Sequence, residues 1–436
     1  MPNILFDVLN GYIIIQRLDC FELMFVELIK EFLSDLRVQR TRAFLTLLAV
    51  SWGTVSVMLL MSFGEGLGTQ LTKGLMNAGN RIMILYGGET RMVFEGLPKG
   101  RRIAFREEDV DVLKTSIPAI AMISPQYRRF VALTYDKKTT NQECEAVNPN
   151  FEEMRRMYPA GGGRFINEED VAKRRRVLFI GVDLAKELFG MKEPIGKIVT
   201  LDGIPFTIIG VMQKKIQTSM NNGPDTWRAV IPYTTYRTMY GDLYLNSIVI
   251  RPSDPSKQQE VKDELFRVLG RKYHFDPKDD QCLWIWDFIE GEKMNNKINT
   301  GVSIFLGAVG LLTLLIAGVG VANVMYAVVK ERTHEIGIKM AIGARKSYIL
   351  FQFIFEALLI AFIGGAIGMF ITWGIVSLVR LFPADNGPMQ FLGRPIISTS
   401  IMFITTGVLA LIGLLSGFFP ARKAANVDPV ESLRYE

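Results

Sequence analysis

The sequence predicts a membrane protein with four transmembrane α-helices and a large α+β extracytoplasmic domain between helices 1 and 2. Hydrophobic residues make up 49% of the 436 residues, and the mean hydropathy is +0.21, both high for a soluble chain of this length. Apolar stretches long enough to cross a hydrocarbon layer of about 30 Å occur once near the start and three times after residue 297. The long segment between the first and second stretches instead has short β-rich runs bounded by turn residues.

The apolar stretches divide the chain into predicted spans, one large domain and a short loop. The second stretch is longer than a bilayer requires, so part of it is expected to stand outside the lipid as a helical stalk. Residues 380–395 contain Pro, Asn and Gly and form a short outer loop. The predicted divisions are TM1 at 43–63, the extracytoplasmic α+β domain at 64–297, the stalk and TM2 at 298–329, TM3 at 349–379 and TM4 at 396–419.

Basic residues next to these spans predict the orientation. Lys and Arg gather in residues 1–42, 330–348 and 420–436, which are therefore expected to be cytoplasmic. The chain is therefore expected to be a multi-pass membrane protein with both termini in the cytoplasm. The 64–297 domain also contains many basic residues, but long domains cross the membrane regardless of charge.

The N-terminal segment predicts an amphipathic helix on the inner membrane surface. Apolar residues recur at helical spacing between Phe21 and Leu36, with charged residues on the other face. The apolar residues before Phe21 are interrupted by charges, which makes them a poor span and a poor signal peptide. The sequence leaves open whether residues before Met24 belong to the native protein.

Composition excludes several classes of function. The formal net charge is +6, but the basic residues lie beside apolar runs rather than in one stripe, so no nucleic-acid partner is expected. The cysteines and histidines are too scattered for a metal site. Cys144 and Cys282 fall in the same predicted domain, and the sequence leaves their disulfide status open. No catalytic residues are assigned, and no GxxxxGK[ST] phosphate loop occurs in the sequence.

The 64–297 segment reads as a mixture of short strands and helices. Six β-rich runs lie at 81–86, 177–181, 198–201, 206–212, 229–231 and 247–250, and helices are predicted at 106–115, 183–189 and 255–269. Asp202 and Gly203 separate two of the β-rich runs, which is a hairpin signal. We therefore expect locally antiparallel strands there, in a domain with a binding or mechanical role.

Several separated motifs, all in the order and membrane positions of one family, carry a resemblance. They are ERTHEIGIKMAIGAR at 331–345, Gln352-Phe353, Glu356-Ala357, GFFPARKAA at 417–425, DPVESL at 428–433, and the outer-domain runs at 181–185, 189–190, 194–196 and 209–211. Over about residues 25–436 the chain resembles the MacB-type (FtsX-like) ABC transporter permease family. His334 departs from the family pattern, in which Arg or Lys is more frequent.

The resemblance implies that the segment after TM2 forms a coupling helix in a groove of a cytoplasmic ATPase. Gly343 is expected to end that helix with a positive φ. Glu356 is expected to be interfacial or an anchor near the coupling helix. The implied ATPase-coupling residues are Glu331, Arg332, Thr333, His334, Glu335, Ile336, Gly337, Ile338, Lys339, Met340, Ala341, Ile342, Gly343 and Ala344.

The family also implies a location in the cell inner membrane, a function and a set of partners. A non-catalytic permease subunit would couple ATP hydrolysis by a separate ABC ATPase to movement of the extracytoplasmic domain, for efflux or release of a substrate. This chain would hold no cofactor, with ATP and Mg in the partner ATPase. Further partners are a second permease copy or paralogue, membrane lipid, and a periplasmic adaptor with an outer-membrane duct. The alternative is a membrane-anchored ligand-binding or sensor protein with no ATPase partner. Substrate, homodimer versus heterodimer, and use of an adaptor and duct are not readable.

Small residues in the spans mark candidate helix-packing positions. Their small size allows close backbone approach between helices, as in the GxxxG motif formed by Gly364 and Gly368. The sequence leaves open whether these residues pack within one subunit or in a dimer. The set is Gly307, Gly310, Gly318, Ala322, Gly364 and Gly368.

Overall fold

The computed structural model describes residues 29–32, 34, 37, 40–220, 223–382 and 393–428. These form two compact units, which we call the helical unit (the described residues up to Leu67 and from Thr300) and the inserted domain (Gly68–Asn299). The predicted fold class, four transmembrane helices with a large α+β domain between the first and second, is confirmed. Most of the predicted amphipathic N-terminal helix, and Met24, lie outside the described residues. Residues 29–32 and 34 are helical.

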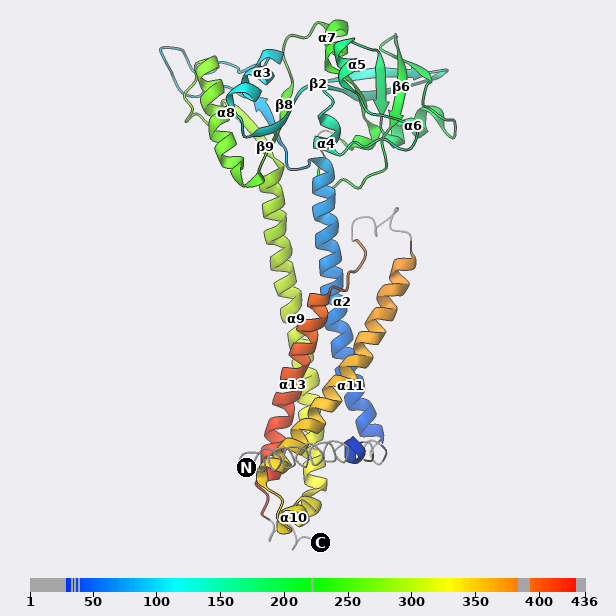
Figure 1. Cartoon of the computed structure of the whole chain (residues 1–436), viewed down its shortest axis with the longest axis vertical. Helices are drawn as coiled ribbons and strands as arrows, with labels where there is room; N and C mark the ends of the chain where they lie inside the picture. Colours follow the sequence, from blue (N-terminus) through cyan, green and yellow to red (C-terminus); the bar gives the residue numbers. More distant parts are fainter. Residues whose placement is uncertain are drawn as a thin grey trace, which may run out of the picture. The chain divides into compact units, whose positions relative to one another are not determined.

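Four helices are long and apolar enough to cross a membrane (Figure 1). They are α2 (Arg40–Ala78), α9 (Phe288–Glu331), α11 (Lys346–Leu381) and α13 (Thr399–Ala425), and the short α10 (Thr333–Ala341) lies between α9 and α11. A span needs about 20 residues. Helices α2 and α9 are about twice that length. The last residues of α2 and the first residues of α9 belong to the inserted domain.

Close backbone approach holds α11 and α13 together in the helical unit. A Cβ atom on Gly365 would lie 2.6 Å from Leu409, and one on Gly417 would lie 2.6 Å from Ala357. The helical unit has its own apolar core, which includes Leu314, Met325, Phe353 and Ala421. Small residues thus let these helices pack at distances that larger side chains would prevent.

The inserted domain is built on nine strands in the order β3-β7-β4-β6-β5-β2-β8-β1-β9. Strand β3 also pairs with β2, so six strands close into a ring, while β8, β1 and β9 extend the sheet from β2. The strands are β1 (Met83–Gly87), β2 (Ile120–Tyr135), β3 (Lys138–Val147), β4 (Val177–Ile180), β5 (Ile198–Leu201), β6 (Ile204–Val211), β7 (Ala229–Pro232), β8 (Ser247–Pro252) and β9 (Leu283–Asp287).

Helices pack on this sheet and bury its apolar residues. The long α8 and the shorter α3 lie beside β8 and β9 (Figure 1), and Leu113 of α3 and Leu265 of α8 share a core with Leu85 and Ile250. The helices of the domain are α3 (Glu107–Ser116), α4 (Phe151–Arg155), α5 (Glu168–Ala172), α6 (Val182–Phe189), α7 (Tyr233–Tyr240) and α8 (Gln258–Tyr273), with 3-10 turns at Asp225–Trp227 and Pro255–Lys257.

The predicted hairpin at Asp202-Gly203 is confirmed. Strands β5 and β6 pair antiparallel, and Asp202 and Gly203 have φ values of +47° and +82°. Both central residues of a tight hairpin turn of this kind need positive φ, which Asp and Gly tolerate. All six predicted β-rich runs overlap strands, and the three predicted helices overlap α3, α6 and α8. Strands β2, β3 and β9 were not predicted.

The two ends of the inserted domain meet. Strand β1 follows α2, strand β9 precedes α9, and these strands are antiparallel neighbours with Met83 opposite Asp287. The Asp287 carboxylate then accepts hydrogen bonds from the first N–H groups of α9, at 2.8 Å from Ile289 N. Further along the two helices, Asn299 Nδ2 donates to Gly68 O at 3.3 Å.

Candidate functional site

The segment between α9 and α11 is a short helix with a sharp exit. Helix α9 ends at Glu331, and α10 runs from Thr333 to Ala341. Gly343 has a φ of +104°, the positive value predicted from its sequence. Its N–H donates to Met340 O at 3.1 Å, and Ala344 N donates to Lys339 O at 3.0 Å. These bonds satisfy the last carbonyls of α10, so the chain can turn at once into α11.

One face of α10 is buried and the opposite face is exposed. Ile336 and Gly337 are buried in the helical unit. Ile338 and Ile342, which are one turn apart, are 42% and 81% exposed. His334 and Glu335 of α10, and Arg345 after the turn at Gly343, are exposed as well. A helix that presents apolar side chains between charged ones has the character of a docking surface. We call this the α10 stripe (His334, Glu335, Ile338, Ile342 and Arg345).

Two ion pairs connect the segment to the N-terminal part of the chain. Arg42 Nη1 lies 2.9 Å from Glu331 Oε1, and Lys339 Nζ lies 2.8 Å from Glu31 Oε1. All four side chains are partly exposed, and exposed pairs contribute at most about 1 kcal/mol each. Their effect is therefore mainly to orient α10. Sequence reasoning assigned Arg42 only to membrane topology and Glu31 only to the polar face of a helix.

Glu356 of α11 is buried rather than placed at a lipid or water interface. It is 9% exposed, and Gln352, one turn earlier on the same helix, is buried as well. Both face the interior of the helical unit near Phe353 and Ala357, which belong to its core. An interfacial position does not fit this burial. The alternative expectation, an anchor near the coupling helix, agrees with the electrostatic interaction of Glu356 with Lys339 of α10.

The candidate helix-packing residues have different surroundings. A Cβ atom on Gly310 would lie 3.0 Å from Val57, and one on Gly318 would lie 2.5 Å from Ile412. On Gly364 it would lie 2.8 Å from Val50, and on Gly368 it would lie 2.6 Å from Thr54. These four glycines thus allow helices of one subunit to approach. Gly307 has open space at this position, and Ala322 is partly buried.

A buried group of charges joins the end of α2 to the rest of the inserted domain. Lys215 Nζ lies 2.7 Å from Asp225 Oδ2, 2.8 Å from Asn77 O at the end of α2, and 2.6 Å from Arg155 O at the end of α4. Asn77 Nδ2 in turn donates to Ile216 O at 2.9 Å. The sequence signals nothing of this cluster, since its members are far apart along the chain.

The Asp225 carboxylate continues the cluster toward the sheet. Its Oδ1 lies 2.7 Å from Arg155 Nη2 and 3.3 Å from Arg228 Nε. Arg228 also contacts Glu143, at 3.2 Å, and Glu145, both on β3. Burial alone would raise the pKa of Asp225, but the three cations outweigh it and hold that pKa below its usual range. We call these residues the Lys215 cluster (Glu143, Glu145, Arg155, Lys215, Asp225 and Arg228).

Cys144 and Cys282 are both free and buried. Burial raises the pKa of each thiol, to about 12 for Cys282, so both remain protonated and inert at neutral pH. The sequence had left a disulfide between them open. Cys20 lies outside the described residues.

This fold and the segment between α9 and α11 define a multi-pass membrane protein with a folded domain inserted between its first two spans. The chain belongs to the MacB-type, FtsX-like permeases of ABC transporters. Residues 43–268 match the MacB-like periplasmic core domain, and residues 307–429 match the FtsX-like permease C-terminal family. The predicted family is therefore confirmed.

Two individual relatives, which share one name with each other, illustrate this similarity. The chain is 30% identical over 416 residues to the macrolide export ATP-binding/permease protein MacB of Bdellovibrio bacteriovorus, covering 94% of this chain and 62% of the relative. It is 30% identical to the protein of that name from Wolinella succinogenes, covering 99% of this chain and 63% of the relative. The chain thus spans less than two thirds of these relatives. The crystal structure of the periplasmic region of MacB from Actinobacillus actinomycetemcomitans aligns with 17% identity and a TM-score of 0.41, covering 52% of this chain and 96% of that one.

Proposed function

We propose that this chain is the permease subunit that couples ATP hydrolysis by a separate ABC ATPase to movement of the inserted domain. The observation that carries the proposal is the α10 stripe, where Ile338 and Ile342 are exposed beside charged residues. The name of the matched relatives includes both an ATP-binding and a permease function. The sequence of this chain has no GxxxxGK[ST] phosphate loop. In this proposal, ATP and Mg²⁺ bind in the ATPase partner.

The two long helices supply a route for the movement. Helix α9 is continuous from Phe288, directly after β9, to Glu331, two residues before α10. Helix α2 is continuous from Arg40, close to the Arg42–Glu331 pair, to Ala78 near the Lys215 cluster. A continuous helix keeps its backbone hydrogen bonds along its length, so displacement at one end is carried to the other. Mechanical transmission, rather than passage of cargo between the spans, is the proposed mechanism.

The positions of basic residues support the orientation proposed for this mechanism. Residues 330–348 and the segments before α2 and after α13 would face the cytoplasm and the ATPase, with the inserted domain on the outer side. Further proposed partners are a second permease copy or paralogue, membrane lipid, and an adaptor with an outer-membrane duct. The relatives' printed name makes export of a substrate at the outer side the proposed task.

Co-purification from native membranes tests the proposal. The detergent-solubilised full chain would be pulled down as wild type and as the double variant Ile338→Asp, Ile342→Asp, followed by an ATPase assay. A matched control places Asp at Ile198, an isoleucine of the inserted domain that is 63% exposed. We expect an ATPase with wild type and with Ile198→Asp, and its loss with the double variant. If no ATPase accompanies the wild type, the chain acts without one and the sensor function takes its place.

A further inference from the structure

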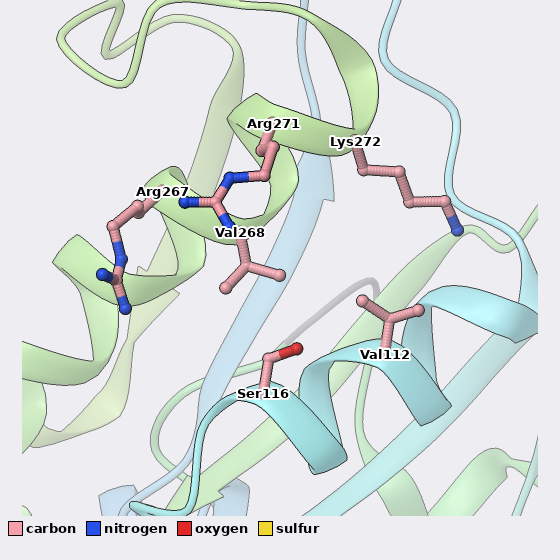
Figure 2. Close-up of a pocket in the computed structure, with 6 residues that line it drawn as sticks. All are labelled: Val112, Ser116, Arg267, Val268, Arg271 and Lys272. Atoms are coloured by element: carbon pink, nitrogen blue, oxygen red, sulfur yellow. The ribbon is translucent and has the colours of Figure 1, made fainter.

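A basic hollow lies between α3 and α8 of the inserted domain, apart from the α10 stripe. Its volume is about 470 Å³, within the range of small-molecule sites. Figure 2 shows Val268 of α8 facing Val112 and Ser116 of α3, with Arg267 and Arg271 on the α8 side and Lys272 extending away from them. The residues that line the hollow therefore carry three positive charges and no negative charge.

Only one of these three cations lacks a partner among the described residues. Arg267 pairs with Glu264 on its own helix. Lys272 Nζ lies 2.5 Å from the buried Asp109 carboxylate of α3. Arg271 makes no hydrogen bond or ion pair within the part of the chain that the structure describes. Its guanidinium group is thus the charge that is available to a ligand.

The simplest structural role for Arg271 is already filled by another residue. Cations in the last turn of a helix offset the negative partial charge of its unpaired carbonyls. At the end of α8, Arg101 donates to Tyr273 O at 3.1 Å and to His274 O. His274 N and Phe275 N both donate to Gly270 O. Arg271 is therefore not required to satisfy this helix end.

We propose that the hollow binds a small organic oxyanion, a carboxylate or phosphate that carries a short apolar group, through Arg271. A guanidinium group matches the two oxygens of such an anion with two parallel hydrogen bonds. The Ser116 hydroxyl supplies a further donor, and Val112 and Val268 supply apolar walls. The hollow is much larger than a bare inorganic ion, which is why an organic anion fits it better. The inference does not depend on the coupling role of α10.

Calorimetric titration of the full chain in detergent tests this site. The probe is phenyl phosphate, and a second arm uses a short-chain phosphatidic acid, which presents the same phosphate chemistry on a lipid. We expect saturable binding of at least one probe, and Arg271→Gln to weaken it by about tenfold or more, as for the loss of a charge-assisted bidentate contact. Tighter binding of phenyl phosphate assigns the site to a soluble anion, and tighter binding of the lipid assigns it to a headgroup.

A matched control separates the site from general positive charge. Lys192→Gln removes an exposed cation elsewhere in the inserted domain and is expected to leave the affinity unchanged. Added salt should weaken binding to the wild type more than to Arg271→Gln. Equal affinity of Arg271→Gln and wild type, or no saturable binding of either probe to the wild type, would overturn the proposal. Thermal unfolding of each variant checks that it is folded.

Discussion

The Lys215 ammonium group lies 2.7 Å from the Asp225 carboxylate and also donates to Asn77 O and Arg155 O. Two of its protons have backbone carbonyl acceptors, and its charge forms an ion pair with the Asp225 carboxylate. The end of α2, the end of α4 and the 3-10 turn at Asp225 are thus held by one nitrogen atom. Burial lowers the pKa of Lys215, while the Asp225 charge opposes that change.

Replacement of this lysine is expected to be strongly destabilising. Lys215→Met keeps the length of the side chain but leaves Asp225 with one cation fewer and two helix-end carbonyls without their donor. Loss of one partner from a buried ion pair costs about 3–5 kcal/mol. Thermal unfolding in detergent measures the effect, with the exposed Lys192→Met as the control. An unfolding temperature equal to that of Lys192→Met would show that the cluster does not hold α2.

Stability should also fall on acidification, and Asp225 should account for much of the change. Its pKa is depressed in the folded protein and is about 3.9 in an unfolded chain. Its contribution is therefore fully present above about pH 4 and is lost as the pH falls toward the folded pKa. Asp170 has a depressed pKa too, because bonds from Arg164 and the Asn167 N–H outweigh the effect of burial.

Asp225→Asn provides the corresponding test. The variant should be less stable than wild type at neutral pH and should lose less stability between about pH 5 and pH 2, since its amide does not titrate. Denaturant unfolding at several pH values measures both effects. Parallel pH profiles for wild type and Asp225→Asn would exclude Asp225 as a main source of the acid sensitivity.

Gly74 of α2 makes room for Thr218, in the segment that carries Lys215. A Cβ atom on Gly74 would lie 2.3 Å from Thr218 Cγ2, and Thr218 N donates to Gly74 O at 3.3 Å. In an exposed helix, Gly→Ala stabilises by up to about 1 kcal/mol. We expect Gly74→Ala to destabilise instead, as measured by thermal unfolding. Adding Thr218→Gly should recover part of the loss, whereas additive effects of the two changes would argue against the contact.

Gly368 and Gly307 both lie in membrane spans but differ in the space around them, so one serves as the test position and the other as its control. A Cβ atom on Gly368 would lie 2.7 Å from Ser51 O, a backbone atom that cannot easily move, while one on Gly307 would meet open space. Gly368→Ala should therefore separate α11 from α2 and lower the unfolding temperature in detergent by several degrees. Gly307→Ala should be tolerated. An equal fall in unfolding temperature in both variants would mean that any Gly→Ala change in a membrane helix has this effect, and that the close contact at Gly368 is not its cause.

The membrane spans and the turns were predictable because each depends on local sequence. A run of apolar residues specifies a span, and Asp202-Gly203 and Gly343 specify their own positive φ values. Strand β3 was missed because residues 138–145 are almost all polar, and its buried Glu143 and Glu145 face Arg228 rather than an apolar core. Periodicity methods register hydrophobic residues, so they cannot detect a strand that buries charge pairs.

The candidate site was predictable only in part for the same reason. The sequence of residues 331–345 indicated a helix and its end, but not which face of that helix is exposed. That face follows from the burial of Ile336 and Gly337 against helices distant in the sequence. The members of the Lys215 cluster come from four separate segments, and Arg271 differs from its basic neighbours only in lacking a carboxylate nearby. Such relationships arise from tertiary structure.

The contact between Asn299 and Gly68 has a consequence for how this protein can be altered. The first and last residues of the inserted domain are hydrogen-bonded to each other. The two ends of the domain are therefore as close together as the ends of a short loop that joins two antiparallel helices. A module attached in this way can be exchanged for another with similarly spaced ends, or for a short turn, without rerouting the helices that carry it. Four spans of one design can therefore carry different outer domains.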